Sequence, residues 1–223
     1  MKIIIIYGTS TDVGKTFFTT KYIKHLKNKG KKVFAIKPVL SGALDKDFGD
    51  NDVANCDVSL IYKALNPKEH FSFKELCFAR LKTPASPDIA ASLEGFNLKL
   101  QDVIEFCKKT IAYCKKNNYD YLLIETAGGF ASPIAKDGLC IDLSLAIKPS
   151  KSIIVTAPYL GAISHLLSAY HLHKFDAVVF NYMPQKTTPS NICHLDYCKM
   201  VCNSMQNHLK RHLGGIKIIN CKE

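Results

Sequence analysis

A glycine-rich loop near the start of the chain carries the residues whose spacing most clearly suggests chemistry. Residues 7–16 read YGTSTDVGKT, so that Gly8 is followed by five residues and then by Gly-Lys-Thr. The backbone N–H groups of such a turn and the helix N-terminus behind it stabilise an anion. Lys15 would add a mobile positive charge, and Thr16 could give its hydroxyl to a magnesium ion. The loop predicts phosphate binding, although it is one residue longer than the common pattern; the alternative is a plain strand-to-helix turn.

Carboxylates further along the chain are candidate partners for such a magnesium ion. Mg²⁺ prefers oxygen ligands and usually takes one or two carboxylates beside phosphate and water. Glu125 ends the apolar run YLLIE, where the alternative is an exposed strand terminus. The segment GDNDVANCD offers Asp50, Asp52 and Asp57, and any of them could instead cap a helix. For Asp52 the pattern alone favours the capping role.

A second lysine lies where it could act on a reacting group. Lys37, in AIKPVLSG, follows an apolar run and precedes a proline, which keeps the backbone extended. An ammonium group held there could neutralise charge that develops on a transferring phosphoryl group. A lysine exposed to solvent is an equally good interpretation of the pattern.

These residues need a scaffold, and the hydrophobic pattern predicts one. Apolar runs predict strands over residues 2–6, 32–36, 121–125, 152–157, 177–181 and 216–220. Helical spacing predicts helices over residues 16–29, over about 20 residues from Leu100, and over residues 162–173. Alternating strands and helices indicate an α/β fold with a mostly parallel sheet and helices on both faces. Ligands bind beyond the carboxyl ends of such strands, where the loop, Lys37, Glu125 and Asn181 fall.

Composition narrows the class of protein. With 223 residues, 47% of them apolar and 22% charged, the chain is expected to form one globular domain over residues 1–223. No apolar run approaches the roughly 20 residues of a membrane helix, and no secretory signal is evident. Nine scattered cysteines suggest free thiols in a cytoplasmic protein.

The formal charge of +11 suggests an anionic partner, but no nucleic-acid-binding module accompanies it. A nucleotide or an acidic metabolite is therefore expected, and nucleic acid and membrane partners are not. The segment CHLDYCKMVC at residues 193–202, with His208 and His212 beyond it, raises a metal site as an alternative. Its spacing matches no common zinc pattern, so Cys198 and Cys202 are predicted to lie on the buried face of a helix.

Taken together, several ordered motifs give the chain a resemblance to one family, the dethiobiotin synthetases. The resemblance runs from the first residue to about Tyr197 and rests on these stretches: GTSTDVGKT (8–16), KPVLSG (37–42), ND (51–52), SPDIAASLEG (86–95), ETAGG (125–129), LGAISH (160–165) and FN (180–181). In that family the longer loop is normal. The resemblance implies a homodimeric P-loop fold and a magnesium- and ATP-dependent ring closure. The substrates would be 7,8-diaminononanoate and carbon dioxide, joined through a carbamate and a carbamic-phosphoric anhydride.

The same resemblance implies roles for individual residues. Those expected around the nucleotide are Gly8, Asp12, Val13, Gly14, Lys15, Thr16, Phe17, Glu125, Gly128 and, at the purine, Asn181. Thr16, Asp52 and Glu125 are expected around magnesium. The expected catalytic residues are Lys15, Lys37, Thr11 and Ser41, the last three beside the carbamate or diamine. Gly161, Ser164 and Tyr197 are expected to meet the carboxylate tail of a diamine bound to the partner subunit.

Three departures from the family pattern lead to further expectations. Asp12 stands in place of a glutamate, and Thr126 in place of a glycine. A β-branched residue tolerates positive φ badly, so the turn after Glu125 is expected to be tighter. The chain ends shortly after IKIIN, without the proline-containing segment that normally helps to enclose the base, so relaxed nucleotide discrimination is predicted.

Two other functions are compatible with a phosphate loop on this fold. One is a related ATP-dependent enzyme such as a cobyrinate-type synthase domain. The other, from a different class, is a partitioning or regulatory ATPase that binds a macromolecular partner. Such an ATPase would hydrolyse ATP without a diamine, which is the property that separates it from a ring-closing ligase.

Overall fold

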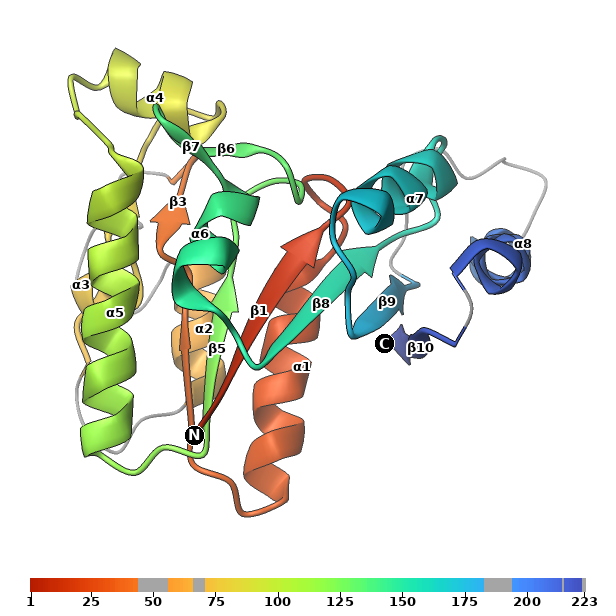
Figure 1. The fold of residues 1–223 in the computed structure, drawn as a ribbon, viewed down its shortest axis with the longest axis horizontal. Helices are drawn as coiled ribbons and strands as arrows, with labels where there is room; N and C mark the ends of the chain where they lie inside the picture. The colour runs from red at the N-terminus through yellow and green to blue at the C-terminus, as the bar shows by residue number, and fades with distance from the viewer. Residues whose placement is uncertain (44–55, 66–70, 183–193, 214, 222–223) are drawn as a thin grey trace.

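A parallel six-stranded sheet, in the order β10-β9-β8-β1-β5-β2, forms the centre of the molecule (Figure 1). The computed structural model describes residues 1–43, 56–65, 71–182, 194–213 and 215–221. The strands of this sheet are β1 (Lys2–Gly8), β2 (Val33–Ile36), β5 (Tyr121–Glu125), β8 (Lys151–Thr156), β9 (Ala177–Asn181) and β10 (Lys217–Cys221). The α/β fold with a parallel sheet predicted from the sequence is confirmed.

Helices and two small sheets complete the fold. The helices are α1 (Lys15–Asn28), α2 (Asp57–Leu65), α3 (Phe73–Leu76), α4 (Pro87–Leu93), α5 (Leu100–Lys116), α6 (Cys140–Ile147), α7 (Ala162–Leu172) and α8 (His194–Leu213). The small sheets pair β3 (Val39–Leu40) with β4 (Ala79–Arg80), and β6 (Pro133–Ala135) with β7 (Gly138–Leu139). The short strands were not predicted, because two- or three-residue pairings carry no periodic pattern.

β1 lies in the interior of the sheet, and its residues suit a strand that is covered on both faces. Its run Ile3–Ile6 is β-branched throughout, and Ile4, Ile5 and Ile6 are buried, as expected for a strand of a parallel sheet. The strand pairs with β5 on one side and β8 on the other, with Ile6 opposite Glu125 and Gly8 opposite Val155. The end of β1 is thereby fixed beside the ends of its two neighbours.

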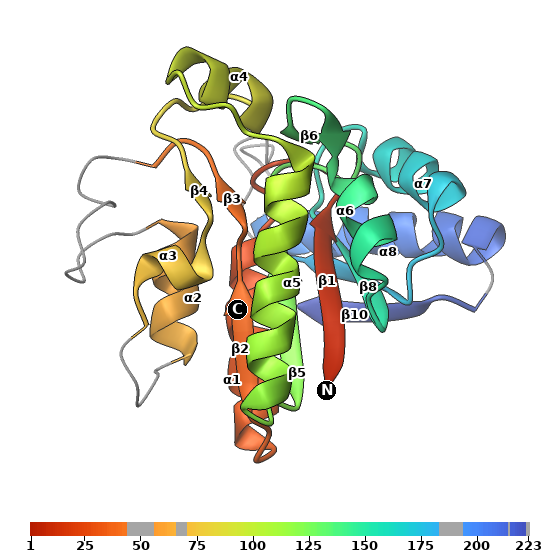
Figure 2. The same ribbon diagram turned by 60° about the vertical axis from the view of Figure 1, so that its left-hand side comes forward.

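Helices cover both faces of the sheet, as Figures 1 and 2 show. α5, α6 and α7 lie in front of it in Figure 1, and α1 and α2 lie behind, packed against each other. α1 ends at Asn28, and Gly30 follows with φ 70°, a left-handed conformation that glycine adopts without strain. The chain can therefore reverse sharply into β2.

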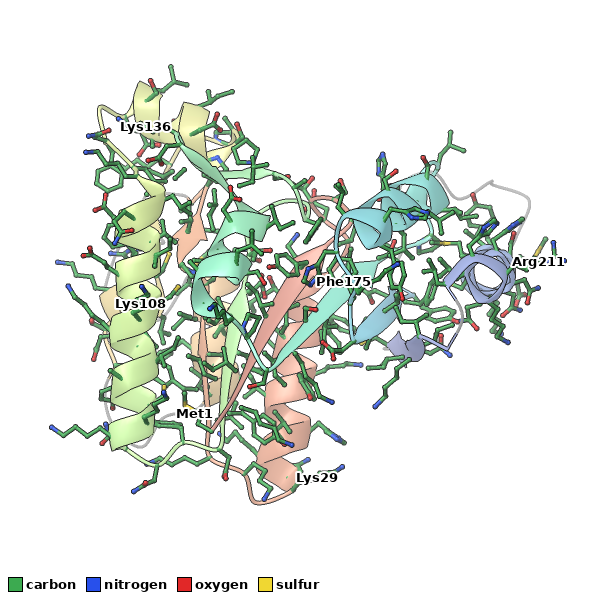
Figure 3. All side chains as sticks on the ribbon, viewed as in Figure 1. Met1, Lys29, Lys108, Lys136, Phe175 and Arg211 are labelled. Carbon is green, nitrogen blue, oxygen red and sulfur yellow. The ribbon has the colours of Figure 1, made fainter. Side chains whose placement is uncertain are left out.

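Positive charge is spread over the outside of this scaffold. Figure 3 labels Lys29, Lys108 and Arg211 in three different parts of the fold, and all three are exposed, whereas the labelled Phe175 is buried. No helix among the described residues combines the length and apolar character needed to cross a bilayer.

Candidate active site

The phosphate loop links the end of β1 to the start of α1 and curls around its own lysine. The Lys15 ammonium donates hydrogen bonds to the carbonyls of Ser10, at 3.0 Å, and Gly128, at 2.7 Å. A Cβ atom at Gly8 would lie 2.7 Å from the Ser10 oxygen and 2.9 Å from the lysine nitrogen, so this close turn requires glycine. Gly14 has φ 82° and immediately precedes α1. The loop thus places its backbone at a helix N-terminus, where an anion is favoured.

Burial sets the charge state of the loop lysine. Lys15 is 6% exposed, and burial, together with the nearby charge of Lys37, lowers the pKa of Lys15 from 10.5 to about 8. An anion bound beside the ammonium would reverse this shift, because an opposite charge favours the protonated form.

Glu125 is the centre of a buried polar cluster. Its side chain has no exposed surface, so the alternative of an exposed strand terminus is wrong. The Thr16 hydroxyl donates to Oε1 at 2.5 Å, and the Thr19 hydroxyl donates to Oε2 at 2.7 Å. The Lys37 ammonium donates to Oε1 at 3.0 Å. Because buried carboxylates are costly unless paired and hydrogen-bonded, these three donors explain how Glu125 can stay in the core.

Lys37 bridges two carboxylates. It is 5% exposed, so the interpretation of a solvated lysine is wrong, and its ammonium pairs with both Glu125 and Asp57. Burial alone would lower the pKa of Lys37, but these two carboxylates hold it above its ordinary value. Burial would likewise raise the pKa of Asp57, but the Lys37 ammonium outweighs it and keeps the pKa below the usual range. Lys37 therefore carries a fixed positive charge.

Asp57 was one of three aspartates that the sequence pattern left open as helix caps, and the structure places it at this site. It begins α2, and its contact with Lys37 brings α2 to the ends of β2 and β5. Asp50 and Asp52 lie outside the described residues, so the expected metal role of Asp52 stays a prediction. The sequence did contain a signal, which was a carboxylate at the start of an amphipathic helix. Such a residue lies at one end of its helix, beside the ends of neighbouring elements. Nothing in the pattern, however, separated Asp57 from Asp52.

A cavity of about 650 Å³ joins the loop to this cluster. The predicted site residues that line it are Thr11, Asp12, Gly14, Lys15, Thr16, Phe17, Lys37, Ser41 and Gly128. Asp57 lines it too, together with Thr20, Lys24, Leu60, Lys63 and Ala64 from α1 and α2. The volume is within the range of small-molecule sites, which is roughly 300–1,000 Å³.

Other predicted residues are not among those that line this cavity. Val13 and Asn181 are buried, and the Asn181 amide donates to the Val13 carbonyl at 3.0 Å. Gly161 immediately precedes α7, Ser164 lies in its first turn, and Tyr197 lies on α8. None of these residues lines the cavity.

Thr126 begins the turn after Glu125. Thr126 is absent from the described residues with positive φ, and its N–H donates to the Ile6 carbonyl at 3.0 Å. The threonine thus continues the pairing with β1 without adopting positive φ, and the expectation of a tighter turn than in the family stays a prediction. The left-handed residue is Gly128, with φ 58°, whose carbonyl holds Lys15.

Burial supports the core role that was predicted for the cysteine- and histidine-rich segment. Cys198 and Cys202 are buried on α8, as predicted. Burial raises the pKa of both thiols, that of Cys202 to about 12, which disfavours the thiolate that metals bind. Over the ranges that the structure describes, no group of three or more histidine, cysteine or acidic side chains could hold a metal ion.

A P-loop nucleotide-binding protein is the class that this sheet and this loop define. The family model described as an AAA domain matches residues 2–207. Among solved structures, the hydrogenase maturation factor HypB from Archaeoglobus fulgidus has a similar fold, with a TM-score of 0.52 and 15% identity, covering 100% of this chain and 81% of that one. At that identity the likeness concerns the fold alone.

Comparison with curated proteins gives the family. An ATP-dependent dethiobiotin synthetase BioD of Methylobacterium nodulans is 33% identical over 195 residues, covering 85% of this chain and 84% of the relative. The corresponding proteins of Phenylobacterium zucineum and Methanocaldococcus jannaschii are each 34% identical, and cover 96% and 76% of this chain and 85% and 72% of their own lengths. The chain belongs to the ATP-dependent dethiobiotin synthetase family.

Proposed function

We propose that this protein is an ATP-dependent dethiobiotin synthetase, which closes a cyclic urea from 7,8-diaminononanoate and carbon dioxide in biotin biosynthesis. One observation carries the proposal beyond the family match. A phosphate-loop lysine, Lys15, and a second buried lysine, Lys37, line the same cavity. Simple nucleotide binding requires only the first of them.

The chemistry proceeds in three balanced steps. One amine of the substrate attacks carbon dioxide and loses a proton, which gives a carbamate. A carbamate oxygen then attacks the terminal phosphorus of ATP and ADP leaves, which gives a carbamic-phosphoric anhydride. The second amine attacks the carbonyl carbon, loses a proton and expels phosphate, which closes the ring. A carbamate is a poor electrophile, so the phosphoryl group supplies the leaving group that it lacks.

The protein's part is positioning and charge stabilisation. Lys15 is proposed to contact the terminal phosphates. Lys37 is proposed to steady the carbamate and the phosphoryl group in transfer, with Thr11 and Ser41 beside the diamine. Because its pKa is held above the ordinary value, Lys37 acts as a permanent charge and hydrogen-bond donor and does not serve as a base.

Magnesium is proposed to be held by Thr16, Glu125 and Asp57. A hydroxyl and two carboxylates are the oxygen donors that Mg²⁺ prefers, and both carboxylates reach the same ammonium group, so this donor set fits the ion. When bound, the ion would neutralise charge on the phosphates. Asp52 stays the residue first expected in this role, Asp57 is proposed as a second candidate for it, and the two assignments can be separated by mutation.

Three further points belong to the proposal. The enzyme is proposed to be a homodimer of one-domain subunits, acting in the cytoplasm without nucleic acid or membrane partners. Gly161, Ser164 and Tyr197, which lie outside the cavity of their own chain, are proposed to meet the carboxylate tail of a diamine bound to the partner subunit. Competition between ATP, GTP and CTP would test the nucleotide discrimination of the enzyme.

Phosphate release tests the proposed function directly. Purified protein should release phosphate from ATP only when both diaminononanoate and bicarbonate are present, and mass spectrometry should detect the cyclic urea. Hydrolysis that ignores both substrates would favour the partitioning or regulatory ATPase.

Lys37→Ala should lower turnover by about 100-fold or more with nucleotide affinity nearly unchanged, because the ammonium acts on charge in the transition state. Lys29→Ala removes an exposed lysine far from the site (Figure 3) and should leave turnover unchanged. A Lys37→Ala enzyme with normal turnover and only a higher KM would contradict the role.

The carboxylate assignment is tested by comparing Asp57→Asn with Asp52→Asn. Asp57→Asn should raise the magnesium concentration for half-maximal turnover by about tenfold or more, and should weaken Mn²⁺ binding in the presence of ATP, measured by electron paramagnetic resonance. A larger effect of Asp52→Asn would return the role to Asp52.

A further inference from the structure

Asn181 faces the phosphate loop from the end of β9. Its side chain has no exposed surface, and its Nδ2 atom donates a hydrogen bond to the Val13 carbonyl oxygen at 3.0 Å. The two residues are separated by 168 positions in the chain. In the sheet, β9 is two strands away from β1, so this hydrogen bond reaches across β8 to the middle of the loop.

The backbone around Val13 needs such a restraint. Asp12 has φ 54° and Gly14 has φ 82°, so left-handed residues flank Val13 on both sides. A non-glycine residue in this region is uncommon and costs free energy that its surroundings must supply. At the start of the loop, the Thr9 N–H is held by the Val155 carbonyl at 2.9 Å. Asn181 supplies the corresponding hydrogen bond at the middle.

The hydrogen bond also orients the next amide. In a planar trans peptide the carbonyl and the N–H point in opposite directions, and no described peptide bond is cis. Because the Val13 oxygen is held toward β9, the Gly14 N–H is held away from β9. Gly14 lines the cavity, beside Lys15. Asn181 therefore fixes the direction of an amide donor at the place where phosphate is expected.

We infer that Asn181 is a positioning residue for triphosphate binding, which acts through the Val13–Gly14 peptide. The inference rests on the proposed function only in taking the loop to bind phosphate. It is separate from the purine contact that the family resemblance implies, because Nδ2 of Asn181 donates to the loop while Oδ1 has no hydrogen-bond partner among the described residues and is left for a base. Loss of the loop hydrogen bond should accordingly weaken the binding even of a ligand without a base.

Binding of inorganic tripolyphosphate, ATP and GTP, measured by calorimetry, tests this. Asn181→Ala removes the donor, and Asn181→Asp keeps the shape but sets a carboxylate against a carbonyl. Loss of one hydrogen bond predicts about tenfold weaker tripolyphosphate binding for Asn181→Ala, and ATP and GTP binding should weaken at least as much. Asn181→Asp should weaken all three further. Weaker ATP binding with unchanged tripolyphosphate binding would overturn the inference in favour of a purine contact.

A control separates positioning from general damage. Asn220, on neighbouring β10, accepts hydrogen bonds from Tyr182 and Gln206, so Asn220→Ala should lower stability but leave tripolyphosphate affinity unchanged. The Gly14 amide gives a second readout by NMR. Its resonance should shift on addition of tripolyphosphate to the wild type and much less in Asn181→Ala. Equal shifts in both proteins would refute the role.

The outcome is independent of the ring-closing reaction. A wild-type protein that binds tripolyphosphate but shows no diamine-dependent phosphate release would contradict the proposed function and leave this inference standing. Equal affinities of the wild type and both Asn181 variants would contradict the inference and leave the function standing.

Discussion

Thr19→Val is the perturbation that most directly tests how the buried carboxylate of Glu125 is held. The Thr19 hydroxyl lies 2.7 Å from Glu125 Oε2 and 2.9 Å from the Lys15 carbonyl. Its single hydrogen can serve only one acceptor, and bonds to ionised groups are roughly twice as strong as neutral ones. We therefore assign the hydrogen to Glu125. Valine has nearly the same shape and a similar helix propensity, so the substitution removes little besides the hydroxyl.

The magnitude follows from burial. Thr19 and Glu125 have no exposed surface, so water cannot replace the lost donor. A hydrogen bond to a charged group contributes about 1.5–3 kcal/mol net, and Thr19→Val should lower the free energy of unfolding by about that amount at pH 7. Oε2 would also turn more freely, which should weaken the magnesium binding proposed for Glu125 by about tenfold, as loss of an outer-shell partner typically does.

Thr110→Val provides a matched comparison. The Thr110 hydroxyl donates to the Phe106 carbonyl at 3.0 Å within α5, a neutral acceptor that also belongs to a helix. Its removal should lower the free energy of unfolding by no more than about 1 kcal/mol. Urea unfolding of the wild type, Thr19→Val, Thr19→Ser and Thr110→Val, fitted with one common m-value, gives the differences in the free energy of unfolding. Thr19→Ser keeps the hydroxyl and should retain magnesium affinity.

Two outcomes would refute the reasoning. Equal losses for Thr19→Val and Thr110→Val would mean that the hydroxyl serves the Lys15 carbonyl and that Glu125 does not depend on it. Unchanged magnesium affinity in Thr19→Val, with reduced stability, would mean that Thr19 supports the core but does not orient the carboxylate.

Two further predictions concern the loop. The pKa of Lys15 is lowered from 10.5 to about 8, so above pH 8 the ligand-free protein loses the charge that phosphate needs. Tripolyphosphate affinity should fall by about tenfold per pH unit between pH 8.5 and 10; a flat profile would show that Lys15 stays protonated. Gly8→Ala would place a Cβ atom 2.7 Å from the Ser10 carbonyl oxygen, and it should abolish measurable nucleotide binding. Gly30→Ala, where no atom lies within 4 Å of the new Cβ, should cost stability only, and similar binding by both variants would contradict the steric argument.

The strands and the phosphate loop could be predicted from the sequence because both are local patterns. The isoleucines of β1 are β-branched and continuous, and a glycine loop follows them at once. The end of such a strand in a parallel sheet is a known place for ligands. Glu125 could be proposed for the same reason, since it ends β5.

The ion-pair cluster could not be predicted because tertiary packing creates it. Lys37 follows a strand and Asp57 begins a helix, and nothing within either segment specifies that they meet. Only the packing of α2 against α1 and β2 brings Asp57 to the lysine. The hydrogen bond from Asn181 to Val13 is equally non-local, and the resemblance to relatives suggested a different partner for that amide.

The connections of the loop have a consequence for the newly made chain. Thr9, Val13 and Lys15 leave the ribosome early, but their hydrogen-bond partners are Val155, Asn181 and Gly128. At about 5–20 residues per second, the 168 positions between Val13 and Asn181 take roughly 10–30 s to synthesise. ATP therefore cannot template the earliest stages of folding through the complete loop, because a nascent chain has all the partners of the loop only after Asn181 has been synthesised.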